Sequence, residues 1–199
     1  GIIGAGSMGG AILGGLLAPG VTVTGGIRVT NRTEAKAALL RQPGVESFAI
    51  ENTPDANARA VAGAAVVLIG VKPAMVRGTL TALAGALEPD ALVISVAAGV
   101  TTATMEGIVS QAVLRAMPNT PALVGKGVTG LAAGSRAAAE QSRAAGHDRA
   151  MDPALNGGDG FDGMFVDDAR GAMVAYDNTF RNTSSSAEYN PTFFPGYDK

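Results

Sequence analysis

Six residues near the start of the chain carry its clearest chemical signal. Gly4-Ala5-Gly6-Ser7-Met8-Gly9 has the spacing G-x-G-x-x-G, directly after the apolar pair Ile2-Ile3 and at the start of a helix-compatible stretch from Ser7 to Leu17. In such a loop the first glycine permits a tight turn, the second lets a pyrophosphate approach the backbone, and the third allows close helix-strand packing. The pattern predicts a dinucleotide site at a helix N-terminus. The alternative is a glycine-rich turn without a ligand.

A second polar group, Asn31-Arg32-Thr33, ends the next apolar run, about where a dinucleotide fold meets the adenosine ribose. An NAD site usually has a carboxylate there, whereas these positions carry an amide, a guanidinium and a hydroxyl. Arg32 can hold a phosphate through two parallel donors, and Thr33 can add a hydroxyl. We therefore predict a preference for NADP over NAD, although Glu34, one residue into the helix, argues against it. Alternatively, Thr33 only caps that helix and Arg32 is solvated.

Three further groups follow later apolar runs. Val71-Lys72-Pro73 and Ser95-Val96-Ala97-Ala98-Gly99 each end an aliphatic run, and Met117-Pro118-Asn119-Thr120-Pro121 follows the last one. Ligands bind at the carboxyl ends of strands in open α/β sheets, so these groups are candidates to surround a cofactor ring or its substrate. Lys72, Asn119 and Thr120 are the candidate catalytic residues. The alternatives are a solvated lysine and a purely structural proline loop.

The elements that must position these groups alternate along residues 1–133. We expect strands at residues 2–3, 28–30, 46–49, 66–71, 91–96 and 113–116, and helices over residues 7–17, over about 33–41, from Thr53-Pro54 onward and from Pro73 onward. Continuous β-branched runs that alternate with helices indicate a parallel sheet covered on both faces. The predicted fold is α/β, a doubly wound Rossmann-type sheet.

The composition divides the chain near residue 134. Eight of the nine aromatic residues lie in the last 39 positions, whereas residues 134–199 hold only Leu155, Val166 and Val174 as Val, Ile or Leu. We therefore expect an NADP-binding domain over residues 1–133 and a C-terminal tail of unknown structure over residues 134–199. The net charge of −2 does not indicate a nucleic-acid surface. The absence of cysteine excludes disulfides and thiol nucleophiles and fits a cytoplasmic location.

Two other kinds of site were weighed. Residues 1–27 contain no charge, but ten of them are glycine and Pro19-Gly20 interrupts the apolar run, so we expect no membrane span. Residues 157–165 fit one calcium-binding nonapeptide, G-G-x-G-x-D-x-U-x. Such repeats bind calcium only when they are stacked, and a single copy is present, so we expect no metal site.

Five segments taken together resemble pyrroline-5-carboxylate reductase: Ile3–Gly10, Asn31–Thr33, Val71–Pro73, Ser95–Val100 and Arg115–Thr129. The first two occur in several NADP reductases, whereas the last three, in this order, are specific to that family. The resemblance implies reduction of the cyclic imine pyrroline-5-carboxylate to L-proline with NAD(P)H, the last step of proline biosynthesis. It ends near residue 133, and the family's later S-G-S-G-P-A-Y and S-P-G-G segments, from its helical dimerisation domain, are not found.

The resemblance also implies roles for individual residues. The pyrophosphate would be lined by Ile3, Gly4, Ala5, Gly6, Ser7 and Met8, and the 2′-phosphate by Arg32 and Thr33. The ribose and nicotinamide would be lined by Val71, Lys72, Pro73, Val96, Ala97 and Ala98. Asn57, fifteen residues before Lys72, falls where the family places an asparagine on the cofactor. Because a protonated imine is already electrophilic, positioning and the cofactor supply most of the catalysis, and no nucleophile is required.

Three functions of different classes remain open from the sequence. The first is an NADP-dependent imine reductase that acts on a small molecule and, as the family implies, forms a homo-oligomer. The second is a dinucleotide-binding module without turnover, which the missing dimerisation domain favours. The third is a calcium-stabilised extracellular or interaction protein, which rests on one nonapeptide. We favour the first for the family and the second for the activity of this chain, with no nucleic-acid or membrane partner.

Overall fold

A computed structural model of the chain describes residues 1–119, 128–137, 161–166 and 173–178. The strands are β1 (Ile2–Ile3), β2 (Ile27–Asn31), β3 (Val45–Ala49), β4 (Val66–Ile69), β5 (Leu92–Ser95), β6 (Ala112–Pro118), β7 (Val128–Ala133), β8 (Phe161–Val166) and β9 (Met173–Asn178). The helices are α1 (Ser7–Leu16), α2 (Glu34–Ala38), α3 (Ala56–Val61), α4 (Pro73–Leu83) and α5 (Thr102–Glu106). Within these ranges no helix has the length and apolar character needed to cross a membrane.

The described strands form one sheet in the order β3-β2-β1-β4-β5-β6-β7-β8-β9. All pairs from β3 to β6 are parallel, and those from β6 to β9 are antiparallel. Successive strands are added toward one edge of the sheet from β1 to β3 and toward the other edge from β4 to β6. The boundary between β1 and β4 is therefore the topological switch point, where open α/β sheets bind ligands. The predicted doubly wound Rossmann-type sheet is therefore confirmed.

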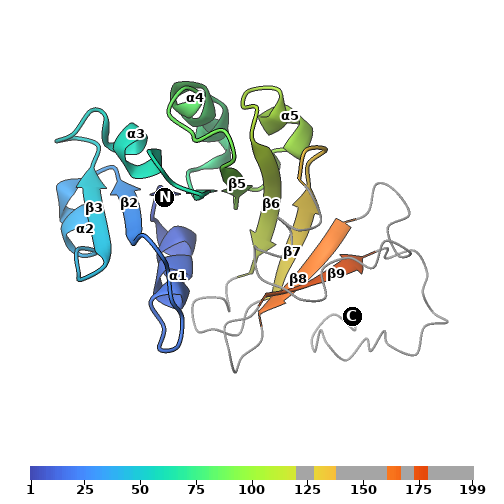
Figure 1. The fold of residues 1–199 in the computed structure, drawn as a ribbon, viewed down its shortest axis with the longest axis horizontal. Helices are drawn as coiled ribbons and strands as arrows, with labels where there is room; N and C mark the ends of the chain where they lie inside the picture. Colours follow the sequence, from blue (N-terminus) through green and yellow to red (C-terminus); the bar gives the residue numbers. More distant parts are fainter. Residues whose placement is uncertain (120–127, 138–160, 167–172, 179–199) are drawn as a thin grey trace.

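Helices cover both faces of the parallel part of the sheet (Figure 1). On one face lie α3, α4 and α5, whose Val61, Leu80 and Met105 pack in a fully buried cluster with the strands. On the opposite face, Leu13 of α1 packs in a second cluster with Val29 of β2. Because the central strands β4 and β5 are covered on both faces, their odd and even positions are mostly apolar, which is why their sequences are largely aliphatic runs.

Two helices differ from their expected bounds. The helix expected from Thr53-Pro54 begins at Ala56, because the Thr53 N–H donates to the Ala49 carbonyl oxygen and this residue still belongs to the turn that leaves β3. The helix expected to reach Arg41 ends at Ala38, since the next backbone bonds join residues three apart and tighten the chain into a turn.

The last parallel strand is longer than expected. We predicted a strand ending at residue 116 and a stiff loop over residues 117–121, but β6 continues through Pro118. Strand β7 pairs with it antiparallel, with Met117 opposite Gly130 and Pro118 opposite Thr129. A proline is tolerated there because it occupies the end of the strand, where a missing N–H interrupts no continuing ladder.

Two strands lie in the tail, where the sequence indicated none. Strand β8 pairs antiparallel with β7, from Val128 opposite Phe165 to Leu131 opposite Asp162. Strand β9 pairs with β8 in the same sense. Such pairing satisfies backbone groups at a sheet edge and does not require an aliphatic core, which is why the low aliphatic content did not exclude it. Residues 157–160 of the nonapeptide lie outside the described residues, and residues 161–165 belong to β8.

The residues that follow β7 are tied back to α5. The Arg136 guanidinium donates to the carbonyl oxygens of Glu106, Val109 and Gln111. In return the Glu106 carboxylate accepts from the Arg136 N–H and from the Ser135 hydroxyl, each at 2.9 Å. Partial burial opposes ionisation, but the hydrogen bonds from Arg136 and Ser135 outweigh it and lower the pKa of Glu106. The division of the chain at residue 134 stays a prediction.

Candidate functional site

The glycine turn lies at the carboxyl end of β1, at the switch point of the sheet. Gly4 has a φ of 85°, a backbone conformation that glycine adopts without strain. Its N–H lies 3.2 Å from both the carbonyl and the hydroxyl oxygen of Thr30, and the Ala5 N–H donates to that carbonyl at 2.9 Å. Thr30 is fully buried. Sequence analysis did not single out this residue, although a polar residue within a β-branched run was a signal that could have identified it.

Three segments meet at the carbonyl oxygen of Gly4. A Cβ on Gly9 of α1 would lie 2.8 Å from that oxygen, and a Cβ on Gly70, just after β4, would lie 2.7 Å from it. Side-chain carbons essentially never approach an oxygen so closely. Gly9 therefore has the packing role expected of the third glycine in the motif. Gly70 was missed by the sequence analysis, although a glycine that interrupts an aliphatic strand marks a close backbone approach.

The second glycine of the motif faces open space. No heavy atom lies within 4 Å of a Cβ built on Gly6, and both Gly6 and Ser7 are exposed. Gly6 is the N-cap of the ten-residue helix α1, and no side chain caps the helix there. The positive end of the helix dipole and its unpaired N–H groups are thus accessible to an anion. Around them Ile3 and Ala5 are buried and Met8 is half-buried, so these three would meet a ligand mainly through backbone.

The predicted ribose end of the site lies at the carboxyl end of β2. Asn31 is 5% exposed, and its Nδ2 has no hydrogen-bond partner. Arg32 is exposed, and within the described residues its guanidinium makes no hydrogen bond or ion pair. Thr33 occupies the N-cap position of α2, but its hydroxyl makes no capping hydrogen bond. The guanidinium and the hydroxyl are therefore both available to a ligand.

The Glu34 carboxylate beside this end is paired. Both of its oxygens accept from the Arg41 guanidinium, and one also accepts from the Asn52 side-chain amide at 3.2 Å. The Arg41 hydrogen bond is the main reason that the pKa of Glu34 lies below its ordinary value. The Glu34 N–H donates to the carboxylate of Glu51. The residue that argued against NADP is thus held by a cation of the same protein.

The loops after β4 and β5 lie side by side, because these strands pair in register from Val66–Leu92 to Ile69–Ser95. Lys72 is exposed at the N-cap position of α4, and its side chain makes no capping bond. The fully buried Ser95 hydroxyl accepts from the Ala97 N–H at 3.3 Å and shapes the second loop. The other predicted residues differ in exposure: Val71 and Val96 are half-buried, Ala97 is buried, and Pro73 and Ala98 are exposed.

Three predicted residues come from other elements. Asn57 lies in the first turn of α3, where its buried Oδ1 has no hydrogen-bond partner. Asn119 is exposed and directly follows β6, whose carboxyl end shares the sheet edge with those of β4 and β5. Thr120 lies outside the described residues. The structure therefore places the described candidates along one edge of the sheet, on the loops that follow β1, β2, β4, β5 and β6 and on the first turn of α3.

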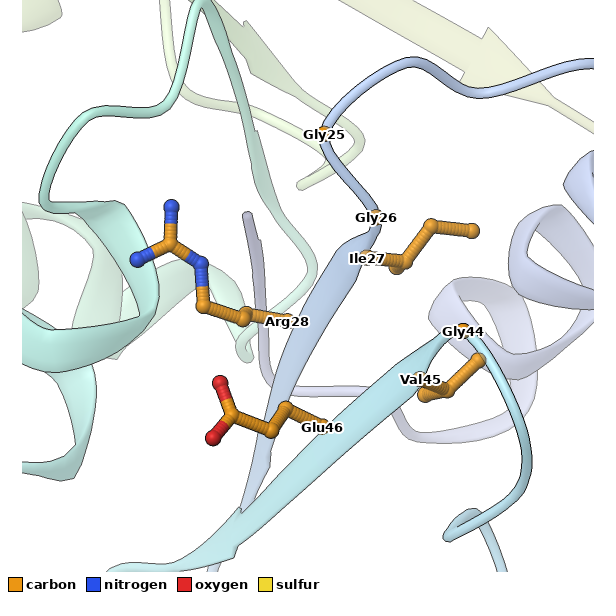
Figure 2. Close-up of a pocket in the computed structure, with 7 residues that line it drawn as sticks. All are labelled: Gly25, Gly26, Ile27, Arg28, Gly44, Val45 and Glu46. Atoms are coloured by element: carbon orange, nitrogen blue, oxygen red, sulfur yellow. The ribbon is translucent and has the colours of Figure 1, made fainter.

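A hollow of about 470 Å³ lies at the opposite edge, at the amino ends of β2 and β3 (Figure 2). Its lining includes Gly25, Gly26 and Gly44, together with the register partners Arg28 and Glu46. The sticks in Figure 2 show Arg28 and Glu46 on one side of the two strands and Ile27 and Val45 on the other. Arg28 also donates to the Arg59 carbonyl oxygen at 2.9 Å. Because parallel sheets bind ligands at their carboxyl ends, we do not place the cofactor site in this hollow.

A parallel sheet ordered β3-β2-β1-β4-β5-β6, with a glycine turn and an open helix N-terminus at its switch point, is the architecture of a dinucleotide-binding domain. Residues 1–99 match the family described as NADP oxidoreductase, coenzyme F420-dependent. These residues are similar to that family of NAD(P)-dependent oxidoreductases, which agrees with the NADP-dependent oxidoreductase that the sequence predicts.

The relatives found by comparison share a more specific name than the family above, pyrroline-5-carboxylate reductase. The chain is 40% identical over 146 residues to the pyrroline-5-carboxylate reductase of Pseudomonas aeruginosa, covering 72% of this chain and 51% of that protein. It is 38% identical over 131 residues to that of Escherichia coli, covering 65% and 47%. The structure of the Coxiella burnetii pyrroline-5-carboxylate reductase matches with a TM-score of 0.64 and 35% identity over 72% of this chain and 52% of that one. The resemblance to this family is therefore confirmed.

A more distant solved structure supports the fold alone. The pyrroline carboxylate reductase of Plasmodium falciparum, solved with NADP bound, matches with a TM-score of 0.60 at 18% identity and covers 73% of this chain. The chain spans about half the length of the curated relatives that it matches. The remaining half of those relatives lies outside the matched residues.

Proposed function

We propose that this protein is a pyrroline-5-carboxylate reductase, and that residues 1–133 are its NADPH-binding part. The observation that carries the proposal is that the three glycines of the motif have three different environments, each suited to a different requirement of a pyrophosphate site. Gly4 has the positive φ of a tight turn, Gly9 lacks room for a side chain, and Gly6 has open space before a helix N-terminus. A glycine-rich turn without a ligand has no need of the open second position, whereas a pyrophosphate does.

The residues of the site fit a nicotinamide dinucleotide from end to end. The α1 N-terminus would hold the pyrophosphate, and Arg32 with Thr33 would hold a 2′-phosphate. The unpaired Asn57 Oδ1 is a buried acceptor that a ribose hydroxyl would satisfy. Lys72 and the small residues of the β5 loop would flank the nicotinamide. When bound, this cofactor supplies the hydride for imine reduction, and the protein supplies position.

The test is turnover by the 199-residue chain. NADPH binding is followed by the fluorescence of the reduced cofactor, and its oxidation by absorbance after pyrroline-5-carboxylate is added. We expect saturable binding of NADPH and oxidation that depends on the imine. A chain that binds neither NADPH nor NADH would contradict the proposal at its first step.

A second candidate function is a cofactor-binding module without turnover. The match to about half the length of the curated relatives favours it, because residues of those relatives outside the match can complete their substrate site. Saturable NADPH binding with no imine-dependent oxidation, at any concentration of pyrroline-5-carboxylate, would favour the module over the enzyme. A cytoplasmic location and a homo-oligomeric state remain part of the reductase proposal, and the absence of cysteine fits the reducing compartment.

The Arg32→Asp substitution is expected to weaken NADPH binding by about 10- to 100-fold, since it removes a charge-assisted pair and adds a repelling carboxylate. NADH binding is expected to change little, because NADH has no 2′-phosphate. The measurement is a pair of fluorescence titrations for wild type and variant. Arg77→Asp makes the same change of charge on an exposed position of α4 and serves as the control. Equal affinities of the wild type for both cofactors, or an unchanged preference in Arg32→Asp, would refute the predicted preference for NADP.

A further inference from the structure

A carboxylate lies next to the predicted 2′-phosphate site. Glu34 follows Arg32 and Thr33 directly in the chain and is the first residue of α2. A phosphate monoester carries a charge between about −1.5 and −2 at neutral pH, so an uncompensated carboxylate at this distance along the chain opposes its binding. In NAD sites a carboxylate at this end serves that purpose. The presence of Glu34 therefore requires an explanation if the site takes NADP.

The Glu34 carboxylate is paired with Arg41. Its guanidinium donates to both oxygens of Glu34, in the two-point geometry that arginine forms with carboxylates. Its Nε donates to the Ser47 carbonyl oxygen of β3 at 3.3 Å, so a backbone group also orients the guanidinium. The Asn52 amide adds a third donor to Glu34 at 3.2 Å. Three hydrogen bonds from two residues, Arg41 and Asn52, hold this carboxylate in one place.

We propose that Arg41 is a specificity-determining residue, which compensates the charge of Glu34 and so lets a 2′-phosphorylated nucleotide bind beside it. The inference rests on the proposed function, because it assumes that the adenosine ribose lies at the end of β2. Arg41 acts through Glu34 and touches no nucleotide in this proposal. It is a positioning residue, distinct from Arg32, which would bind the phosphate itself.

The other charged groups near this end do not replace Arg41. Glu51 also lies here, and its carboxylate accepts from the Glu34 N–H. Lys36 is an exposed cation on the same helix as Glu34, but within the described residues it makes no hydrogen bond or ion pair with Glu34. Glu51 is common to all the variants below, and Lys36 offers a cation of equal charge for comparison.

The test measures binding of adenosine 2′,5′-bisphosphate and of adenosine 5′-monophosphate to the 199-residue chain by calorimetry at low salt. We expect Arg41→Gln to weaken binding of the bisphosphate by about threefold to tenfold, as one exposed and partly screened charge would, and the effect to shrink with added salt. Binding of the monophosphate is expected to stay unchanged. The double variant Glu34→Gln, Arg41→Gln is expected to restore the affinity of the wild type.

Two further variants separate this charge effect from a structural role. Arg41→Lys keeps the charge but loses the two-point geometry and the bond to Ser47, and it is expected to retain most of the bisphosphate affinity. Lys36→Gln removes one cation from the same helix and is expected to have a smaller effect that Glu34→Gln does not reverse. A wild-type affinity in Arg41→Gln, or a loss that the double variant fails to restore, overturns the proposal.

The outcomes distinguish this inference from the proposed function. A wild-type chain that binds both nucleotides equally contradicts the preference for NADP, but the change between wild type and Arg41→Gln still decides the role of Arg41. A wild type that prefers the bisphosphate, together with an unaffected Arg41→Gln, retains the proposed function and refutes this inference. Absence of binding of either nucleotide by the wild type overturns both.

Discussion

A Gly6→Ala variant is expected to fold like the wild type and to bind NADPH at least about 10- to 100-fold more weakly, a loss of roughly 1.4–2.8 kcal/mol. The backbone of Gly6 is extended rather than left-handed, and an added Cβ would have no heavy atom within 4 Å. The methyl group would instead occupy the space that a pyrophosphate needs to reach the helix N-terminus. Fluorescence titration gives the affinity, and denaturant unfolding gives the free energy of unfolding.

The matched control for this prediction is Gly14→Ala, eight residues further along in α1. Gly14 is exposed, and a Cβ there would also have no heavy atom within 4 Å. Alanine at this position is expected to leave NADPH binding unchanged and to raise the free energy of unfolding by about 0.5–1 kcal/mol, since glycine is a poor helix former. If Gly6→Ala bound NADPH like the wild type, the pyrophosphate would not lie at this turn and the proposed function would lose its main support.

A Gly70→Ala variant is expected to lose both stability and binding. Its Cβ would lie 2.7 Å from the Gly4 carbonyl oxygen, which is backbone and cannot move aside as a flexible side chain can. Because Gly4 is itself hydrogen-bonded to Thr30 and packs closely against Gly9, either β4 or the whole glycine turn must shift. We expect a decrease of about 1–3 kcal/mol in the free energy of unfolding, typical of overpacking at a close contact. A displaced turn would also weaken NADPH binding.

The control for this second prediction is Gly78→Ala in α4. Gly78 is exposed and has no heavy atom within 4 Å of a built Cβ, so alanine is expected to stabilise the helix slightly. The measurement is denaturant unfolding of the two variants and the wild type, followed by titration with NADPH. A Gly70→Ala variant that unfolds at the same denaturant concentration as the wild type would mean that β1 and β4 approach each other less closely than described.

Much of the fold was predictable because its signals are local. Strands buried on both faces are apolar at most positions, so residues 66–69 of β4 and 92–94 of β5 form uninterrupted aliphatic runs. The proline that opens α4 marks its first turn, because its missing N–H would have no partner there in any case. Strand β7 and the tail strands were not predictable in this way, since antiparallel pairing at a sheet edge depends on which backbone groups a neighbour leaves open.

The candidate site was predictable in part for the same reason. The glycine spacing of residues 4–9 and the polar group at residues 31–33 are short-range patterns, and each has a stated physical requirement. Thr30 and Gly70 were missed because their importance lies in what they touch. Thr30 meets the glycine turn across 26 residues of chain, and Gly70 meets Gly4 across 66 residues. No pattern within a short stretch of sequence indicates a contact between residues so far apart in the chain.

The sequence by itself determined the class of fold, the glycine turn proposed to bind a pyrophosphate and the guanidinium proposed to meet a 2′-phosphate, because these depend on residue type and on spacing within about ten residues. The tertiary structure alone decided which charges are compensated. Glu34 argued against NADP as long as only its neighbours in the chain were considered. The turn after α2 brings Arg41 to both oxygens of Glu34, and the fold brings Asn52 from beyond β3 to the same carboxylate. The electrostatic energy of a charged group depends on the charges near it in space, and only the folded chain determines which groups those are.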